Sequence, residues 1–397
     1  MKTLRKVLLC LLVLVAALAI AVYCVFSNEI STAASMKLLR ERDDSHRDGA
    51  VYTMHVKGGF YLDDFVSQGG VKSDSELIAF ITSHITKGLM KMEIKESDIG
   101  CSSFTATTTD GDRLFARNYD FAKTNTCLVF TEKNAGRHAS ISTVDLQFLG
   151  MDVEKNVEGL MNRISCLAAP YAPLDGVNDA GVACGIYMTY QGGESTVATN
   201  QNTGKPDFTS TTLLRLILDY ADNVDEAVEI ARTYDLHDSA NTSYHYMVAD
   251  ASGRSAILEW VTGTDTTDND GGARELVVHY NDADAYIGER EGASDYQVIT
   301  NFILNPGYYD GCDESVRKGF DRYECLYAAL EETNAVVADE LAAMDVLSLV
   351  GRRSWLNDDG NGCTVHSAVY NLTDLSVTWV PNEHYRDSGA VYTYSLK

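Results

Sequence analysis

The chain begins with a long, uninterrupted apolar run. Val7 to Phe26 contains no charged residue, and three basic residues stand before it. As a helix, these 20 residues would be about 30 Å long, which matches the hydrocarbon core of a bilayer. The apolar region of a signal peptide is shorter, about 7–15 residues. We therefore expect residues 1–26 to be an uncleaved anchor in the cell membrane, with the catalytic domain on the extracellular side. The alternative is a cleaved signal and a secreted protein. The small residues at 31–35 would suit cleavage by a signal peptidase.

Beyond this run the pattern changes to short amphipathic segments. Residues 27–50 are polar and charged, which is typical of a linker. Residues 73–88 carry a capping box and apolar residues at helical spacing, and they predict a helix. The remaining predicted elements are β-hairpins over 103–121, 244–260 and 364–379 and two helices within 212–234. Strands that pair locally, with helices grouped between them, indicate an α+β fold with mostly antiparallel sheets.

Composition and charge narrow the choice of partners. A hydrophobic content of 45% with five prolines is typical of a globular protein. The formal charge of −25 argues against nucleic acid as a partner, because phosphate groups repel it. Of the nine cysteines, seven lie beyond the apolar run. They form no Cys-x-x-Cys pair, so we expect no zinc site and at least one unpaired thiol.

Cys101 follows a glycine and begins the first predicted hairpin. A two-residue turn at Asp110-Gly111 would place it opposite Asp120 with both side chains on one face, and Arg117 on the other. A bulge or twist would then be needed to bring all three together. Cleavage after Gly100 would give Cys101 an α-amine with a reference pKa of about 7.7–8.0, a base beside its own thiol. The carboxylate could hold the ammonium form, and the arginine could favour the thiolate.

Four short motifs, in order along residues 101–380, resemble the choloylglycine hydrolase family. They are ARNYD at 116–120, VNDAGVACGIYMTY at 177–190, VITNFILNP at 298–306 and GFDRYECL at 319–326. This family comprises N-terminal-nucleophile (Ntn) amidases, among them bile salt hydrolases, penicillin V acylases and relatives of acid ceramidase. The resemblance implies their four-layer αββα sandwich fold with mostly antiparallel sheets. It also implies a site that needs no metal and no organic cofactor.

The resemblance extends to single residues of the site. Cys101, Arg117 and Asp120 match the first three functional residues of the family. Asn301 would lend a side-chain amide to the oxyanion hole, and Arg322 would complete the site. The alternative for Arg322 is an ordinary ion pair with an acidic neighbour on a helix surface.

One position of the site is ambiguous. The second oxyanion donor would be a main-chain N–H, which belongs to Tyr187 if two glycines align and to Met188 in an ungapped alignment. Bile salt hydrolases have asparagine here, whereas tyrosine is similar to the penicillin V acylases. Conjugated bile salts are therefore in doubt as the main substrate.

Together these features predict the organisation and activity of the chain. We expect a linker and propeptide over 27–100 and a catalytic domain over 101–397, with autocleavage between Gly100 and Cys101. The product would be a cysteine amidohydrolase that cleaves linear amide C–N bonds. Attachment to a membrane favours amphipathic N-acyl amides as substrates: fatty acyl amides of amines or amino acids, ahead of penicillin V-like compounds and bile salt conjugates.

Two other functions compete with this prediction. One is a non-processing, membrane-tethered protein of the same fold that binds amphiphiles. The other is a papain-like peptidase, which is disfavoured because GCSSF lacks the aromatic residue expected after the nucleophile. The sequence leaves open whether the chain forms a homo-oligomer.

Overall fold

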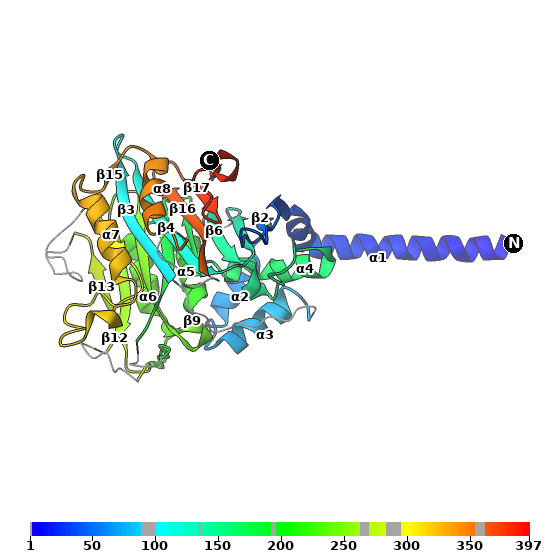
Figure 1. The fold of residues 1–397 in the computed structure, drawn as a ribbon. Helices are drawn as coiled ribbons and strands as arrows, with labels where there is room; N and C mark the ends of the chain where they lie inside the picture. Colours follow the sequence, from blue (N-terminus) through cyan, green and yellow to red (C-terminus); the bar gives the residue numbers. More distant parts are fainter. Residues whose placement is uncertain are drawn as a thin grey trace.

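Two β-sheets lie face to face at the centre of the molecule (Figure 1). The computed structural model describes residues 2–88, 100–134, 136–191, 196–262, 270–282, 295–353 and 362–397. Within these ranges the larger sheet has nine strands, in the order β1 (Lys37–Arg40), β2 (Val51–Val56), β5 (Thr126–Thr131), β6 (Ser140–Asp145), β7 (Asp175–Asn178), β8 (Val182–Thr189), β11 (Ser243–Asp250), β12 (Ser255–Val261) and β13 (Glu275–Tyr280). Its neighbouring strands are antiparallel except β2 and β5, which run parallel.

The smaller of the two sheets carries Cys101. In the described residues its order is β14 (Val298–Ile299), β3 (Gly100–Thr108), β4 (Arg113–Ala122), β16 (Gly362–Asn371), β17 (Ser376–Pro381) and β18 (Tyr392–Ser395), and β15 (Val336–Val337) pairs with β3. The strand that begins at the predicted cleavage site is therefore an inner strand. A separate pair of short strands is formed by β9 (Asp207–Thr209) and β10 (Asp235–His237).

Helices cover the outer faces of both sheets and complete four layers. On the nine-stranded sheet lie α5 (Ser210–Tyr220) and α6 (Val224–Thr233), and on the smaller sheet lie α7 (Phe320–Glu331) and α8 (Glu340–Leu349). Every residue of β8 and β16 is buried, because a helix layer covers one face of each strand and the opposite sheet covers the other. The predicted α+β fold and its αββα layers are confirmed.

Most predicted elements are present near their expected bounds. Helix α3 (Asp74–His84) begins after Ser73, whose side chain accepts a hydrogen bond from the Glu76 N–H, as a capping box predicts. The break between α5 and α6 falls where expected, and β11–β12 and β16–β17 form the two later hairpins. Two short helices, α2 (Leu62–Ser67) and α4 (Gly159–Ser165), were not predicted.

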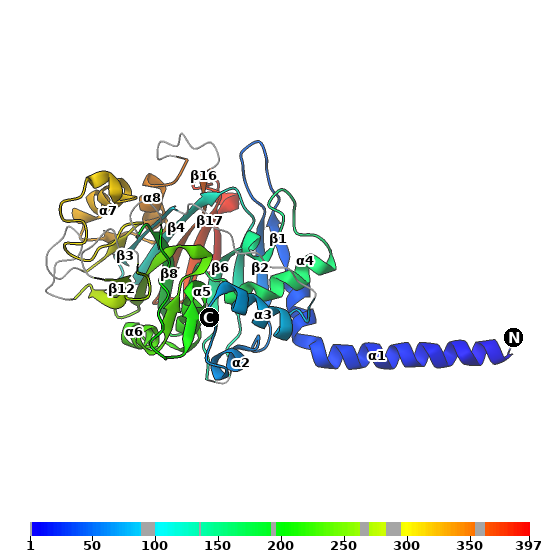
Figure 2. The same cartoon turned by 90° about the horizontal axis from the view of Figure 1, so that it is seen from below.

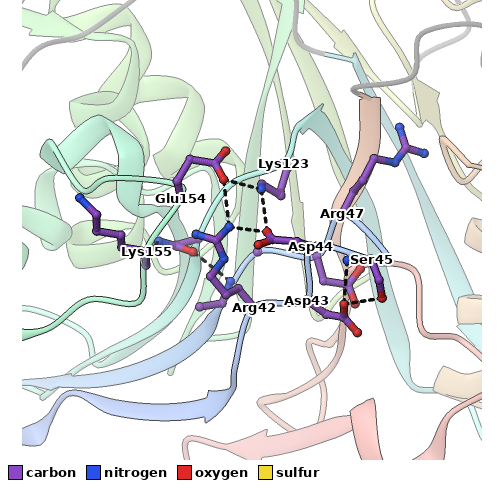
Figure 3. A network of polar contacts seen from close by, with 12 residues as sticks. Arg42, Asp43, Asp44, Ser45, Arg47, Lys123, Glu154 and Lys155 are labelled. Atoms are coloured by element: carbon purple, nitrogen blue, oxygen red, sulfur yellow. Dashed lines mark hydrogen bonds and ion pairs between the residues drawn. The ribbon is translucent and has the colours of Figure 1, made fainter.

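Residues 27–50 are not the linker that their polarity suggested. They include β1 and lead into β2, whose hydrogen bonds to β5 make it part of the nine-stranded sheet. The loop between β1 and β2 also carries charges that pair with the body of the protein (Figure 3). Arg42 lies 2.9 Å from the Glu154 carboxylate, and Asp44 lies 3.2 Å from Lys123 Nζ. The polar residues of this segment are thus a charged surface over a folded structure.

The N-terminal apolar run forms most of α1 (Lys2–Ser35), which projects away from the sheets (Figures 1 and 2). Among the described residues, Leu4–Ser35 is one helix long and apolar enough to cross a membrane. The helix is kinked at Phe26, where the apolar run ends, and its last part packs against β2 and α4. This arrangement is consistent with an anchor or a signal sequence.

Candidate active site

Cys101 is the second residue of β3 and pairs with Tyr119 of β4, not with Asp120. The predicted register was wrong by one residue, because the hairpin turns through three residues, 109–111, instead of two. The last of them, Gly111, has a φ of +96°, a conformation that glycine adopts without strain. A shift of one residue moves side chains to the other face of a strand. Arg117 therefore shares the face of Cys101, and Asp120 lies on the opposite face.

Arg117 is fully buried and makes directed contacts with both sheets. Its Nη2 lies 3.4 Å from Cys101 Sγ, and its Nη1 donates to the Ile186 carbonyl at 2.6 Å. On its other side, Nε lies 2.9 Å from the carboxylate of Asp175 in β7. The Tyr187 ring stacks on the guanidinium, with 4.6 Å between the ring centre and Cζ. One edge of the cation is thus held against the sulfur.

Asp120 faces the peptide bond that precedes Cys101. Its Oδ1 accepts a hydrogen bond from the Thr364 hydroxyl at 2.7 Å. Its Oδ2 is buried and accepts no hydrogen bond, and Arg322 Nη1 lies 3.6 Å away. A Cβ built on Gly100 would stand 3.0 Å from this Oδ2. The site therefore has little room for a side chain at position 100, and an acceptor is held beside that residue.

Asn301 and Arg322 hold the main chain of Cys101. Asn301 Oδ1 accepts from the Cys101 N–H at 2.9 Å and from Arg322 Nη2 at 2.7 Å, while its Nδ2 donates to the Met188 carbonyl at 2.8 Å. Arg322 Nη1 donates to the Cys101 carbonyl and, at 2.7 Å, to Ser102 Oγ. Arg322 is thus turned inward from α7 and does not form the surface ion pair that was the alternative. All the predicted side chains meet around one cysteine.

The comparison with protein families bears on Cys101, Arg117 and Asp120, whereas Asn301 and Arg322 lie beyond the matched residues. Residues 101–266 match the model of the linear amide C–N hydrolases, choloylglycine hydrolase family, and the match begins at Cys101 itself. Over these residues the chain is similar to the linear amide C–N hydrolases of this family.

Solved structures of limited similarity are found alongside the family match. A mutant conjugated bile acid hydrolase from Clostridium perfringens is 14% identical, with a TM-score of 0.47 over 75% of this chain and 92% of that chain. Penicillin V acylase from Agrobacterium tumefaciens is 16% identical, with a TM-score of 0.46 over 71% of this chain and 83% of that chain. The N-acylethanolamine-hydrolyzing acid amidase ortholog of Caenorhabditis elegans is 16% identical, with a TM-score of 0.39 over 75% of this chain and all of that chain (100%).

The environment of Cys101 disfavours the thiolate. Burial raises the pKa of the Cys101 thiol to about 11; Arg117 and Arg322 lower it, whereas Asp120 and Asp175 raise it. Burial alone would also raise the pKa of Asp175, but its interactions, mainly with His366 and the arginine, bring it to about 2. Asp175 is therefore ionised and offsets much of the positive charge beside the sulfur. A nearby base is needed to remove the thiol proton.

Sequence reasoning missed Asp175. It lies two residues before the motif at 177–190, and no motif included it. Asp175 accepts from the Tyr370 hydroxyl at 2.5 Å and lies 3.0 Å from His366 Nε2, in addition to its ion pair with Arg117. These partners come from the opposite sheet, so local pattern could not pair them. A charged residue directly after the apolar stretch 166–174 was the available signal.

Proposed function

We propose that this protein is an autoprocessed cysteine amidohydrolase in which Cys101 becomes the N-terminal nucleophile. The observation that carries the proposal is that three different residues of the predicted site hold Cys101. Asn301 accepts from its N–H, Arg322 donates to its carbonyl and Arg117 reaches its sulfur. A buried structural thiol would need no such set of partners. The family's activity on linear amides fits the same arrangement.

Processing would begin with attack of Cys101 Sγ on the Gly100 carbonyl carbon. A C–S bond forms as the C–N bond breaks, and the thiol proton passes to the departing nitrogen, which becomes the α-amine. Water then hydrolyses the thioester and leaves a Gly100 carboxylate and a free thiol. Asp120 Oδ2 supports this step: it accepts no hydrogen bond within the described residues, and an ammonium group formed at Cys101 would supply a donor.

Turnover would use the new amine as the base. It takes the thiol proton, and the thiolate attacks the carbonyl carbon of an amide. When the tetrahedral intermediate collapses, the C–N bond breaks and the ammonium returns the proton to the leaving amine. Water then attacks the thioester with the amine as general base, the acid is released and the thiol is restored. The high pKa of the buried Cys101 thiol is the reason that such a base is required.

Asn301 Nδ2 and one main-chain N–H would stabilise the oxyanion. The Ile186 N–H donates to the Leu174 carbonyl, on the β7 side of β8. N–H groups alternate in direction along a strand, so the Tyr187 N–H points to β11, where His245 faces it. The Met188 N–H points to the same side as that of Ile186, and this favours Met188 as the main-chain donor. The Tyr187 ring would instead steady Arg117.

The substrate class that we propose is an amphipathic N-acyl amide, with fatty acyl amides of amines or amino acids first. The support is the exposed apolar helix α1, which as an anchor would hold the enzyme at a lipid surface. Penicillin V-like amides and bile salt conjugates are the weaker candidates. If α1 is removed as a signal, the same catalytic domain would be secreted.

The intact mass and N-terminal sequence of the purified protein test the proposal. Wild type and Cys101→Ala are compared, with Cys127→Ala as the matched control because Cys127 is equally buried but lies in β5. We expect a new N-terminus at Cys101 in wild type and in the control, and an uncut chain in Cys101→Ala. Hydrolysis of N-acyl amides of graded chain length would then be lost in Cys101→Ala alone. A folded wild type that keeps Gly100 attached would refute autoprocessing and favour the amphiphile-binding protein.

A further inference from the structure

The segment that carries Asn301 is attached to a buried polar cluster in the nine-stranded sheet. Glu259 of β12 accepts a hydrogen bond from the Leu304 N–H at 2.8 Å through Oε1. The same oxygen lies 2.9 Å from His245 Nδ1 of β11, and Oε2 lies 3.1 Å from His279 Nε2 of β13. Glu259 and His245 are both fully buried. One carboxylate thus joins three strands to the end of this segment.

His245 connects the same carboxylate to the other end of the segment. Its Nε2 lies 2.9 Å from the carbonyl oxygen of Thr300, the residue before Asn301. Both ring nitrogens therefore face acceptors, and a neutral imidazole has a single N–H to donate. When Glu259 is ionised, both hydrogen bonds form together if the ring carries a proton on each nitrogen, and the carboxylate then lies beside the positive charge. Burial would raise the pKa of Glu259, but the hydrogen bonds from the two histidines lower it to about 2.

Two tyrosines pack close to the His245–Glu259 pair, and both are uncharged at neutral pH. The Tyr187 ring packs edge-on against the imidazole, with 5.9 Å between ring centres, and burial raises the pKa of its hydroxyl well above the ordinary range. The Tyr309 hydroxyl accepts from the Ile303 N–H at 3.0 Å, and burial raises its pKa too. Removal of the charge on Glu259 would therefore leave the imidazolium without its main stabilising partner.

We propose that Glu259, acting through His245, is a positioning residue that fixes Asn301 beside Cys101. The inference rests on the proposed function, in which Asn301 takes part in the oxyanion hole. Glu259 holds the segment at two points. It accepts directly from the Leu304 N–H, and through His245 it is connected to the Thr300 carbonyl. Asn301 lies between these two points in the sequence. Asn301 in turn contacts Cys101 and Arg322, so displacement of this segment reaches the nucleophile. Misplacement of a catalytic group by about 1 Å can cost about 100-fold in rate.

The test uses the full-length protein with Glu259→Gln, and Asp207→Asn as the matched control. Asp207 also pairs with a buried histidine, His237, whose second ring nitrogen faces an oxygen atom of Asn200. This pair lies in the small β9–β10 sheet, away from Cys101. With dodecanoyl 4-nitroanilide as the probe, Glu259→Gln should lower kcat by about 10-fold or more and change KM less than about twofold. Asp207→Asn should lower thermal stability but leave kcat within about twofold of the wild-type value.

Hydrogen–deuterium exchange of the peptide that covers 300–304 gives a readout independent of turnover. We expect faster exchange in Glu259→Gln than in wild type, and no change there in Asp207→Asn. If Glu259→Gln does not fold, His279→Gln removes one partner of the same carboxylate and should give smaller changes in the same direction. Unchanged exchange with an unchanged kcat would overturn the proposal. A wild type that hydrolyses no acyl anilide would count against the proposed function instead, and the exchange result would still decide the role of Glu259.

Discussion

After cleavage at Gly100, residues 27–88 should stay bound to the catalytic part without a covalent link. Strand β2 pairs with β5 along its whole length, and the buried apolar side chains of this segment include Val51, Met54, Val56, Leu62, Phe65, Leu77, Phe80 and Ile81. Each fully buried side chain of this kind contributes about 1.5–3 kcal/mol. The carboxylates in the ion pairs of the β1–β2 loop are exposed, and water screens these pairs, so they add little (Figure 3). Apolar packing therefore dominates retention.

Phe65 is the side chain whose loss should weaken this association most clearly. It is fully buried and lies edge-on to Tyr171, on the other side of the cleavage site, with 5.6 Å between ring centres. Phe65→Ala should cost about 3–5 kcal/mol. Since about 1.4 kcal/mol is tenfold, the two fragments should dissociate between about 100-fold and about 5,000-fold more readily. Leu38→Ala, in an exposed strand of the same segment, is the control and should have little effect.

Size-exclusion chromatography of the cleaved protein in detergent, followed by denaturing electrophoresis of each fraction, measures the association. Wild type and Leu38→Ala should show both fragments in one peak down to low concentration. In Phe65→Ala the two fragments should begin to separate at a higher protein concentration than in wild type. In Phe65→Leu the separation should begin at a concentration between those of wild type and Phe65→Ala. Cleavage itself serves as the check that each variant folded. Fragments of cleaved wild type that separate without denaturant would refute the reasoning.

Two further predictions concern buried carboxylates near the site. Asp175→Asn keeps the size of the side chain but leaves the buried Arg117 cation without its charge partner. The free energy of unfolding, measured by chemical denaturation, should therefore fall by about 3–5 kcal/mol. A change below about 1 kcal/mol would contradict this. Burial raises the pKa of Glu383 from 4.5 to about 7, so the folded state binds the extra proton and stability should fall as pH rises from about 4.5 to about 7. Melting temperatures across that range should show this slope reduced in Glu383→Gln, and an identical slope in both proteins would count against it.

Arg117, Asn301 and Arg322, which contact Cys101, could be named from the sequence, but Asp175 and the arrangement around the cysteine could not. The turn at Asp110-Gly111 was found, yet a two-residue and a three-residue loop differ by one position of register. That single step exchanges the faces of Arg117 and Asp120 relative to Cys101. No local pattern distinguishes the two loops with certainty, because glycine suits the positive φ that each requires.

Contacts between distant segments were beyond the reach of pattern reasoning. Asp175 pairs with Arg117 of the opposite sheet. Glu259 accepts a hydrogen bond from Leu304, which is 45 residues later in the sequence. Periodicity predicts which residues form strands, but it does not say which strands face each other. The same limit explains residues 27–50, where the polar character that suggested a linker belongs to loops and exposed positions around β1 and β2.

The place of Cys101 in an inner strand sets an order of events. Its partners come from β4, from the segment after β14 and from α7, so they are assembled only when elements from residue 100 to residue 322 have reached their final positions. A nascent or truncated chain has the cysteine but not its surroundings. Cleavage would then act as a checkpoint that reports completed folding, and the enzyme would remain inert while it is being synthesised and exported.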